Sequence, residues 1–218
     1  MGTVAELWRH PIKSHGREPL ATVDLNAGKC MPWDRHWAVT HEQTKFDGSG
    51  WFYCRNFMIG SRAPKLVGIW AEFDDVSGTI TLRHQDCGEI TFNPDQDDAA
   101  FLAWVAPLCP ADRAAPKAIV KAEGRGMTDS EIPSVSVTNR SSHEAVESAI
   151  GHPLEMERWR ANIWLDGIDA WDELDWVGKK IRIGEAELEV REPIVRCLAT
   201  ATNPVTGVRD TDTLGALK

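Results

Sequence analysis

The sequence predicts a mainly β protein with two or three helices, on the basis of two patterns. Short runs alternate apolar and polar residues between glycine-containing turns, as residues 180–190 do around Gly184, and this alternation is typical of strands in hairpins. Apolar residues at helical spacing occur in few segments, chiefly residues 97–105 and 139–151. A chain of 218 residues is long enough for one large domain or two small ones with a sizeable core.

The first half of the chain is expected to consist of short strands joined by polar loops. The expected strands are residues 3–9, 20–25, 34–40, 65–70 and 78–83. The longest loop, residues 42–56, is polar and rich in glycine. A helix is expected over residues 97–105, because acidic residues at its start suit the helix dipole and Pro107 follows its end.

A stretch rich in proline and alanine, Pro107–Pro116, is the expected linker between two domains, residues 1–110 and 111–218. Glycine, proline and capping residues then divide the second half into further short elements. The elements expected there are strands at 117–121 and 134–138, a helix from Asn139 to Gly151 with Ser141 or Ser142 as N-cap, a hairpin between Gly178 and Gly184, and a strand ending at Cys197.

The composition excludes several classes of protein. The chain carries 24 Lys and Arg against 33 Asp and Glu, a net charge of -9, which argues against binding to nucleic acid or to an anionic membrane. No apolar run approaches a membrane span and the N-terminus has no signal-peptide pattern, so a cytoplasmic protein is expected. The five cysteines are dispersed without paired spacing, which predicts reduced thiols and neither a zinc nor an iron–sulfur site.

Cys197 is the main candidate for chemistry. Arg196 precedes it, and a thiol beside a guanidinium at the end of a strand can ionise readily to a thiolate. A thiolate can act as a nucleophile or as a ligand for a soft metal ion. The alternative is a buried structural cysteine, which is the more frequent role of a single free cysteine.

Two clusters of hydrogen-bond donors accompany this cysteine. The loop after the first strand carries Lys13 and Ser14, and it suits a phosphate cradle as well as an ordinary solvated hairpin loop. Arg35 can pair with a neighbouring carboxylate or bind an anion through its planar fork. Arg160 and Asn162 form the second cluster, whose ordinary interpretation is a strand start with surface arginines.

The run from Arg196 to Asp210, with the pattern RC-x-x-T-x-x-N-P-x-T-G-x-R-D, resembles the signature of MOSC domains, the molybdenum cofactor sulfurase C-terminal family. Further segments similar to motifs of this family and of its associated N-terminal domain are Arg158–Ile163, Trp171–Glu173, Trp176–Gly178, Pro11–Ser14 and Asp34–Arg35. The resemblance spans nearly the whole chain. It implies an N-terminal MOSC-associated β-barrel in residues 1–110 and a MOSC β-barrel in residues 111–218.

The same resemblance implies a molybdenum-molybdopterin cofactor, with Cys197 as the ligand to molybdenum and as the catalytic residue. The cofactor-binding residues that it implies are Lys13, Ser14, Arg35, Thr128, Asp129, Arg160, Asn162 and Arg196. The cofactor would supply two sulfur ligands and Cys197 a third, with one exchangeable oxygen position left for substrate. The basic residues would neutralise the phosphate of the pterin and attract an anionic ligand to an acidic protein.

Family members with both parts include the amidoxime-reducing components and bacterial counterparts, which reduce N-hydroxylated compounds with electrons from haem, flavin or iron–sulfur partners. The resemblance therefore implies a molybdenum-dependent oxidoreductase that acts on a small N-hydroxylated or N-oxide substrate and takes electrons from an external electron-transfer protein. The alternatives are a sulfur carrier with a persulfide on Cys197 and a non-catalytic cofactor-binding protein. Because the family continues past the segment Leu214–Leu217, the MOSC domain is expected to be short at its C-terminus.

Overall fold

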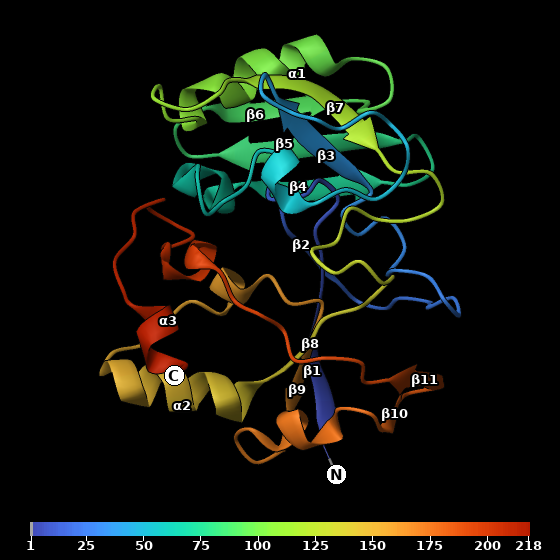
Figure 1. The fold of residues 1–218 in the computed structure, drawn as a ribbon, viewed down its shortest axis with the longest axis vertical. Helices are drawn as coiled ribbons and strands as arrows, with labels where there is room; N and C mark the ends of the chain where they lie inside the picture. Colours follow the sequence, from blue (N-terminus) through green and yellow to red (C-terminus); the bar gives the residue numbers. More distant parts are fainter. Residues whose placement is uncertain (1) are drawn as a thin grey trace.

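The computed structural model describes residues 2–218, which fold into two lobes (Figure 1). Within these residues, short strands are accompanied by the three α-helices α1 (Asp98–Val105), α2 (Arg140–Ile150) and α3 (Thr213–Ala216), and this confirms the mainly β class. The described strands form four sheets of two to four strands, none of which closes into the expected barrels. No helix in this part of the chain is long and apolar enough to cross a membrane.

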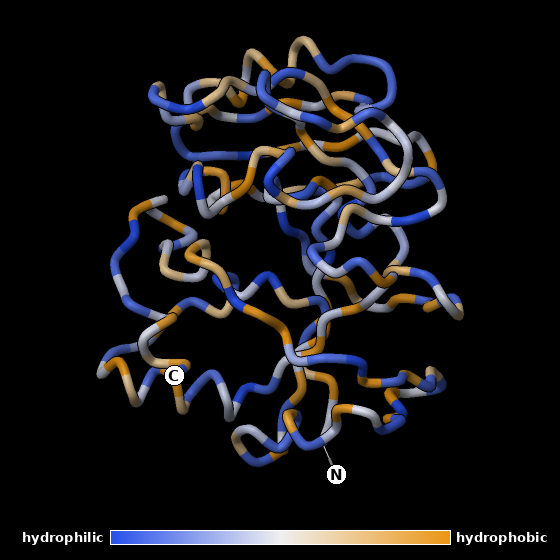
Figure 2. Tube along the Cα trace, in the orientation of Figure 1, coloured by the Kyte–Doolittle hydropathy of each residue, from blue (hydrophilic) through white to orange (hydrophobic). Residues whose placement is uncertain are grey.

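The upper lobe in Figure 1 contains two antiparallel sheets. One consists of β4 (Trp70–Asp74), β5 (Thr79–His84) and β6 (Gly88–Phe92), and the other pairs β3 (Trp37–His41) with β7 (Pro116–Lys121). Alternate side chains of β5 point into the core, where Ile80 and Leu82 are fully buried, as expected for a sheet with one covered face. Helix α1 packs Phe101 onto Phe92 with ring centroids 5.1 Å apart. Figure 2 shows hydrophobic stretches along these strands and hydrophilic ones in the surrounding loops.

The lower lobe is built around one mixed sheet. Its strands, in spatial order, are β2 (Glu18–Leu20), β1 (Thr3–Arg9), β9 (Ile163–Asp166) and β8 (Val137–Asn139). β1 runs antiparallel to β9, whereas β8 runs parallel to β9 and reaches it through α2. A parallel pair needs such a crossover connection.

Each half of the chain contributes a strand to the other lobe. β1, from the first half, pairs with β9 of the second half, and β7, which follows the expected linker, pairs back with β3. Within each lobe, backbone hydrogen bonds therefore join the first half of the chain to the second. The division of the chain at residues 110 and 111 stays a prediction.

Two strands expected in the first half do not lie at their expected positions. A 3₁₀ helix, η2 (Pro64–Gly68), occupies most of residues 65–70, because the ring of Pro64 fixes φ in a range that suits the first position of a helical turn. The strand expected over residues 20–25 lies earlier, at β2, since β1 extends to Arg9 and pairs there with Glu18. Both expectations came from the local sequence. The first is wrong because of the geometry of Pro64, and the second is displaced because of the pairing with β1.

The cap of helix α2 also differs from the expectation. Asn139 is the N-cap, because its side-chain oxygen accepts a hydrogen bond of 3.1 Å from the backbone amide of Ser141. Ser141 and Ser142 therefore lie inside the helix. Gly151 ends the helix with a φ of 91°, a left-handed conformation that glycine adopts without strain.

The chain before Cys197 is not a strand. The expected hairpin around Gly184 is present as β10 (Lys180–Ile183) and β11 (Ala186–Glu189). Residues 190–196 then follow as an extended segment outside the described sheets, where Pro193 has no backbone N–H to donate to a neighbouring strand. Cys197 is the N-cap of a short 3₁₀ helix, η6 (Leu198–Ala201).

Candidate functional site

Lys13 connects the loop between β1 and β2 to the loop before β8. Its buried ammonium donates a hydrogen bond of 2.8 Å to the carbonyl oxygen of Met127 and forms an ion pair with the carboxylate of Asp129. Ser14 follows in a left-handed backbone conformation with a φ of 63°, which is uncommon for a residue other than glycine. The structure thus brings Lys13 and Asp129 together, and it uses Lys13 to hold the second loop in place.

Asp34 is a buried carboxylate beside these loops. It accepts a hydrogen bond of 2.8 Å from the backbone amide of His10, lies 3.3 Å from the ring of His10, and forms an ion pair with Arg35. Burial raises the pKa of Asp34, but the charge of Arg35 and the hydrogen bond with His10 hold that pKa well below its usual range. Burial, Arg160 and Arg35 lower the pKa of His10 to about 3, so its ring is neutral at pH 7.

Arg160 carries a buried charge that is only partly satisfied by protein atoms. Its Nη2 atom donates a hydrogen bond of 3.0 Å to the carbonyl oxygen of Gly16, whereas its buried Nη1 atom has no hydrogen-bond partner in the described residues. Burial, followed by the charges of Arg35 and Arg17, lowers the pKa of Arg160 to about 9. The guanidinium therefore stays charged at pH 7, and a buried cation with a free donor is poorly solvated without an anion.

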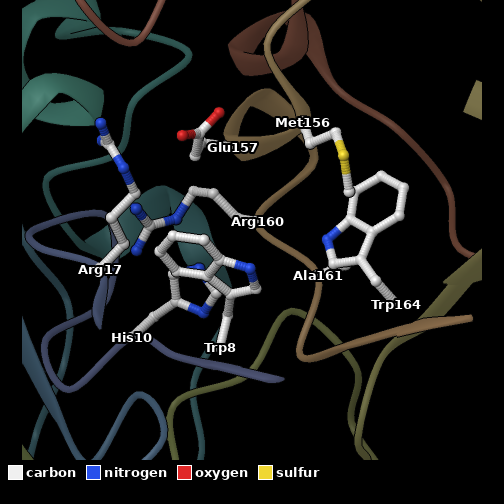
Figure 3. A pocket seen from close by; sticks show the side chains of 8 residues that line it. All are labelled: Trp8, His10, Arg17, Met156, Glu157, Arg160, Ala161 and Trp164. Carbon is white, nitrogen blue, oxygen red and sulfur yellow. The ribbon is translucent and has the colours of Figure 1, made fainter. Parts of the chain in front are cut away.

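Figure 3 shows the recess that Arg160 shares with Arg17, His10 and Glu157. The recess has a volume of about 10 Å³, room for about one water molecule. Arg17 and Glu157 also line a cleft of about 460 Å³. The Nε atom of Arg17 is buried without a partner in the described residues, so a second guanidinium donor is free in this region.

Thr128 and Asn162 differ from the arginines, because their side chains are bound to protein atoms. The hydroxyl of Thr128 donates a hydrogen bond of 3.1 Å to the carbonyl oxygen of Ser130. The amide of Asn162 accepts a hydrogen bond of 3.1 Å from the backbone of Ser136 and donates one of 3.1 Å to the carbonyl oxygen of Trp8. In this structure Asn162 ties β9 to its neighbours.

Cys197 is exposed, which rules out the alternative of a buried structural cysteine. The preceding Arg196 donates a hydrogen bond of 2.9 Å to the carbonyl oxygen of Trp159, and its guanidinium lies 5.4 Å from the centre of the Trp159 ring. Burial, offset in part by the charge of Cys197, lowers the pKa of Arg196 to about 10. A permanent cation therefore stands beside an accessible thiol.

Cys54 is a second exposed thiol at this site, and no motif in the sequence marks it. It belongs to the 3₁₀ helix η1 (Cys54–Asn56) at the end of the long glycine-rich loop. Burial raises the pKa of the Cys54 thiol, and the charges of Asp129 and Cys197 raise it further. Cys54 thus lies close enough to both residues for their charges to act on it, although nothing in its local sequence indicates this proximity.

The arrangement suits an anionic ligand that brings its own metal-binding atoms. Arg17, Arg35, Arg160 and Arg196 gather four positive charges from separate segments, and Lys13 adds a fifth beside Asp129. The negative charges that act on this cluster are those of Asp34, Asp129 and Glu157, so positive charge remains in excess. No group of three or more His, Cys, Asp or Glu side chains in residues 2–218 could hold a metal ion. A metal bound by the Cys197 thiolate would therefore need further ligands from a cofactor, and the surplus cations fit the phosphate of a pterin cofactor.

Comparison with known proteins agrees with this chemistry. Residues 1–112 match the MOSC N-terminal beta barrel domain, and residues 130–215 match the MOSC domain. Mitochondrial amidoxime-reducing component 1 of Mus musculus is 22% identical over an alignment of 248 positions, which covers 96% of this chain and 68% of that protein. The chain therefore belongs to the MOSC family, with the MOSC N-terminal beta barrel domain preceding the MOSC domain.

Proposed function

We propose that this protein binds the molybdenum cofactor and acts as an oxidoreductase that reduces N-hydroxylated or N-oxide substrates. The observation that carries the proposal is the exposed Cys197 thiol beside a cluster of cations that includes Arg160, whose buried Nη1 atom has no hydrogen-bond partner in the described residues. An anionic cofactor would satisfy that cluster, and a thiolate is a suitable ligand for its metal. Similarity to a protein named as amidoxime-reducing supports an N-hydroxylated substrate.

In this proposal the protein positions the cofactor, which supplies two-electron oxygen-atom chemistry when it is bound. Cys197 would provide the thiolate ligand. Arg160 and Arg35 would bind the anionic part of the cofactor, while Lys13 and Asp129 would hold the neighbouring loop in place. Electrons would come from a separate electron-transfer protein.

The test is elemental analysis of molybdenum in the wild-type protein and in the Cys197→Ala and Cys54→Ala variants, made in a host that synthesises the cofactor. Near-stoichiometric metal in the wild type and Cys54→Ala, with loss in Cys197→Ala, is the expected result. Cys54 is a matched control because it is a second exposed thiol of the same site. Absence of metal from the wild type would contradict the proposal.

Turnover separates this proposal from the two alternatives. Reduction of an amidoxime by the loaded protein with a chemical reductant is expected for an oxidoreductase. A persulfide on Cys197, detected by mass spectrometry in metal-free protein, would indicate a sulfur carrier. Stoichiometric cofactor without turnover under any reductant would indicate a cofactor-binding protein.

A further inference from the structure

A buried arginine binds the segment that follows Cys197. Arg158 lies in the 3₁₀ helix η4 (Met156–Trp159), and its side chain is 1% exposed. It donates two hydrogen bonds to Asp210, of 2.8 Å from Nη1 to Oδ1 and of 3.0 Å from Nη2 to Oδ2. This bidentate arrangement fixes both the distance and the orientation of the two groups.

Two more side chains complete the network around Arg158. Its Nε atom donates a hydrogen bond of 2.7 Å to Glu155. The amide of Asn203 donates hydrogen bonds of 2.8 Å to Glu155 and 3.0 Å to Asp210. The run from Arg196 to Asp210 is therefore attached to η4 and its N-cap Glu155 at two points, Asn203 and Asp210.

The start of the run is attached to the adjacent residue. Arg196 is hydrogen-bonded to the carbonyl oxygen of Trp159 and stacks over its ring. The next residue, Arg160, is bound by Arg35 and carries the unpartnered guanidinium donor. Three consecutive residues, 158 to 160, therefore link the Cys197 segment to the cation cluster.

We propose that Arg158 is a positioning residue that fixes Cys197 relative to Arg35 and Arg160. Arg158 acts through Asp210 and Asn203, which belong to the same run of chain as Cys197. The consequence for metal binding rests on the proposed function. Lysine is not an equivalent residue here, because its ammonium cannot form the two parallel hydrogen bonds.

The experiment compares Arg158→Lys and Asp210→Asn with the control Arg140→Lys. Arg140 also forms a salt bridge, of 2.6 Å to Glu6, but its acidic partners belong to β1 and β9 and not to the Cys197 segment. Hydrogen exchange is measured first, on protein without cofactor. The amides of residues 198–210 are expected to exchange at least about tenfold faster in the two test variants, while those of β5 and α2 keep their wild-type rates.

The second measurement uses protein loaded with cofactor. Molybdenum occupancy is expected to fall in Arg158→Lys and Asp210→Asn, and the Mo(V) electron paramagnetic resonance signal of the remaining metal is expected to broaden. Asp210→Glu keeps the carboxylate and should restore occupancy in part. Arg140→Lys should retain the wild-type occupancy and line shape.

Three results would overturn the inference. One is unchanged exchange in residues 198–210, and another is a uniform increase that includes α2 and β5, because it would make Arg158 only a general stabiliser of the fold. The third is faster exchange with wild-type occupancy and line shape. A wild-type protein that binds no molybdenum would overturn both the proposed function and the metal-positioning role. In that case the exchange rates would still test whether Arg158 holds residues 198–210 in place.

Discussion

The guanidinium of Arg35 donates a hydrogen bond of 2.9 Å to the carbonyl oxygen of Arg160, a residue 125 positions further along the chain. Both residues have a left-handed backbone, with φ of 49° and 48°. The contact places two like charges in the same buried region. Asp34, Asp129 and Glu157 balance only part of the positive charge there, because Lys13, Arg17 and Arg196 add to that of Arg35 and Arg160. An anion bound there would relieve their repulsion.

Replacing Arg160 is expected to remove cofactor binding without loss of stability. In Arg160→Met the buried, poorly paired charge is lost, and replacing such a charge by an apolar side chain is often neutral or stabilising. We expect the free energy of unfolding to change by less than about 1 kcal/mol while molybdenum content falls to background. Urea denaturation and elemental analysis test this, with the exposed Arg113→Met as control; a large loss of stability would contradict it.

Replacing Asp34, in contrast, is expected to lower the stability of the protein. Asp34→Asn leaves Arg35 and its neighbours without their buried counter-charge, which should cost about 3–5 kcal/mol of unfolding free energy. The exposed ion pair between Asp86 and Lys65, at 2.7 Å, provides the control, because Asp86→Asn should cost less than about 1 kcal/mol. Equal effects in the two variants would mean that Asp34 does not balance the cluster.

A methyl group at Gly126 is expected to disturb the loop that carries Thr128 and Asp129. A Cβ atom at Gly126 would clash with the carbonyl oxygen of Asp34, and overpacking of this kind costs about 1–3 kcal/mol. Gly124→Ala is the matched control, since Gly124 has a φ of 71° and open space around it, so alanine there costs about 1–2 kcal/mol through backbone strain alone. Thermal denaturation should show both losses, whereas molybdenum content should fall only in Gly126→Ala.

The stability of the protein is expected to fall on acidification below pH 6.5. Burial lowers the pKa of His10 to about 3 and that of His15 to about 4. Between pH 6.5 and 4 the unfolded state binds more protons than the folded state, so stability decreases as pH falls, by up to about 1.4 kcal/mol per pH unit for each histidine. Urea denaturation at pH 7, 6 and 5 measures this slope, which should be smaller in His15→Asn. A slope of zero or of opposite sign would contradict the assignment.

Local patterns predicted the elements that depend on neighbouring residues. Strand β1, helix α1, strand β7 and the hairpin around Gly184 lie within a residue or two of their expected positions. Their signals are alternation, acidic residues at a helix start and glycine at turns. The strand expected to reach Cys197 is absent because no strand in the described residues pairs with residues 190–196, and pairing depends on distant parts of the chain.

The sequence by itself determined the mainly β class, the run from Arg196 to Asp210 that identifies the family, and the residue types of the site that we propose for an anionic cofactor. These properties are local, since they depend on periodicity, turn residues and spacing within short segments. Only the tertiary structure decided that Asn162 is bound to protein atoms while Arg160 keeps a free donor. It also decided that Asp210 binds Arg158. The physical reason is that burial and hydrogen-bond partners come from strands and loops that are distant in sequence, and no periodicity within a segment encodes which of them will meet.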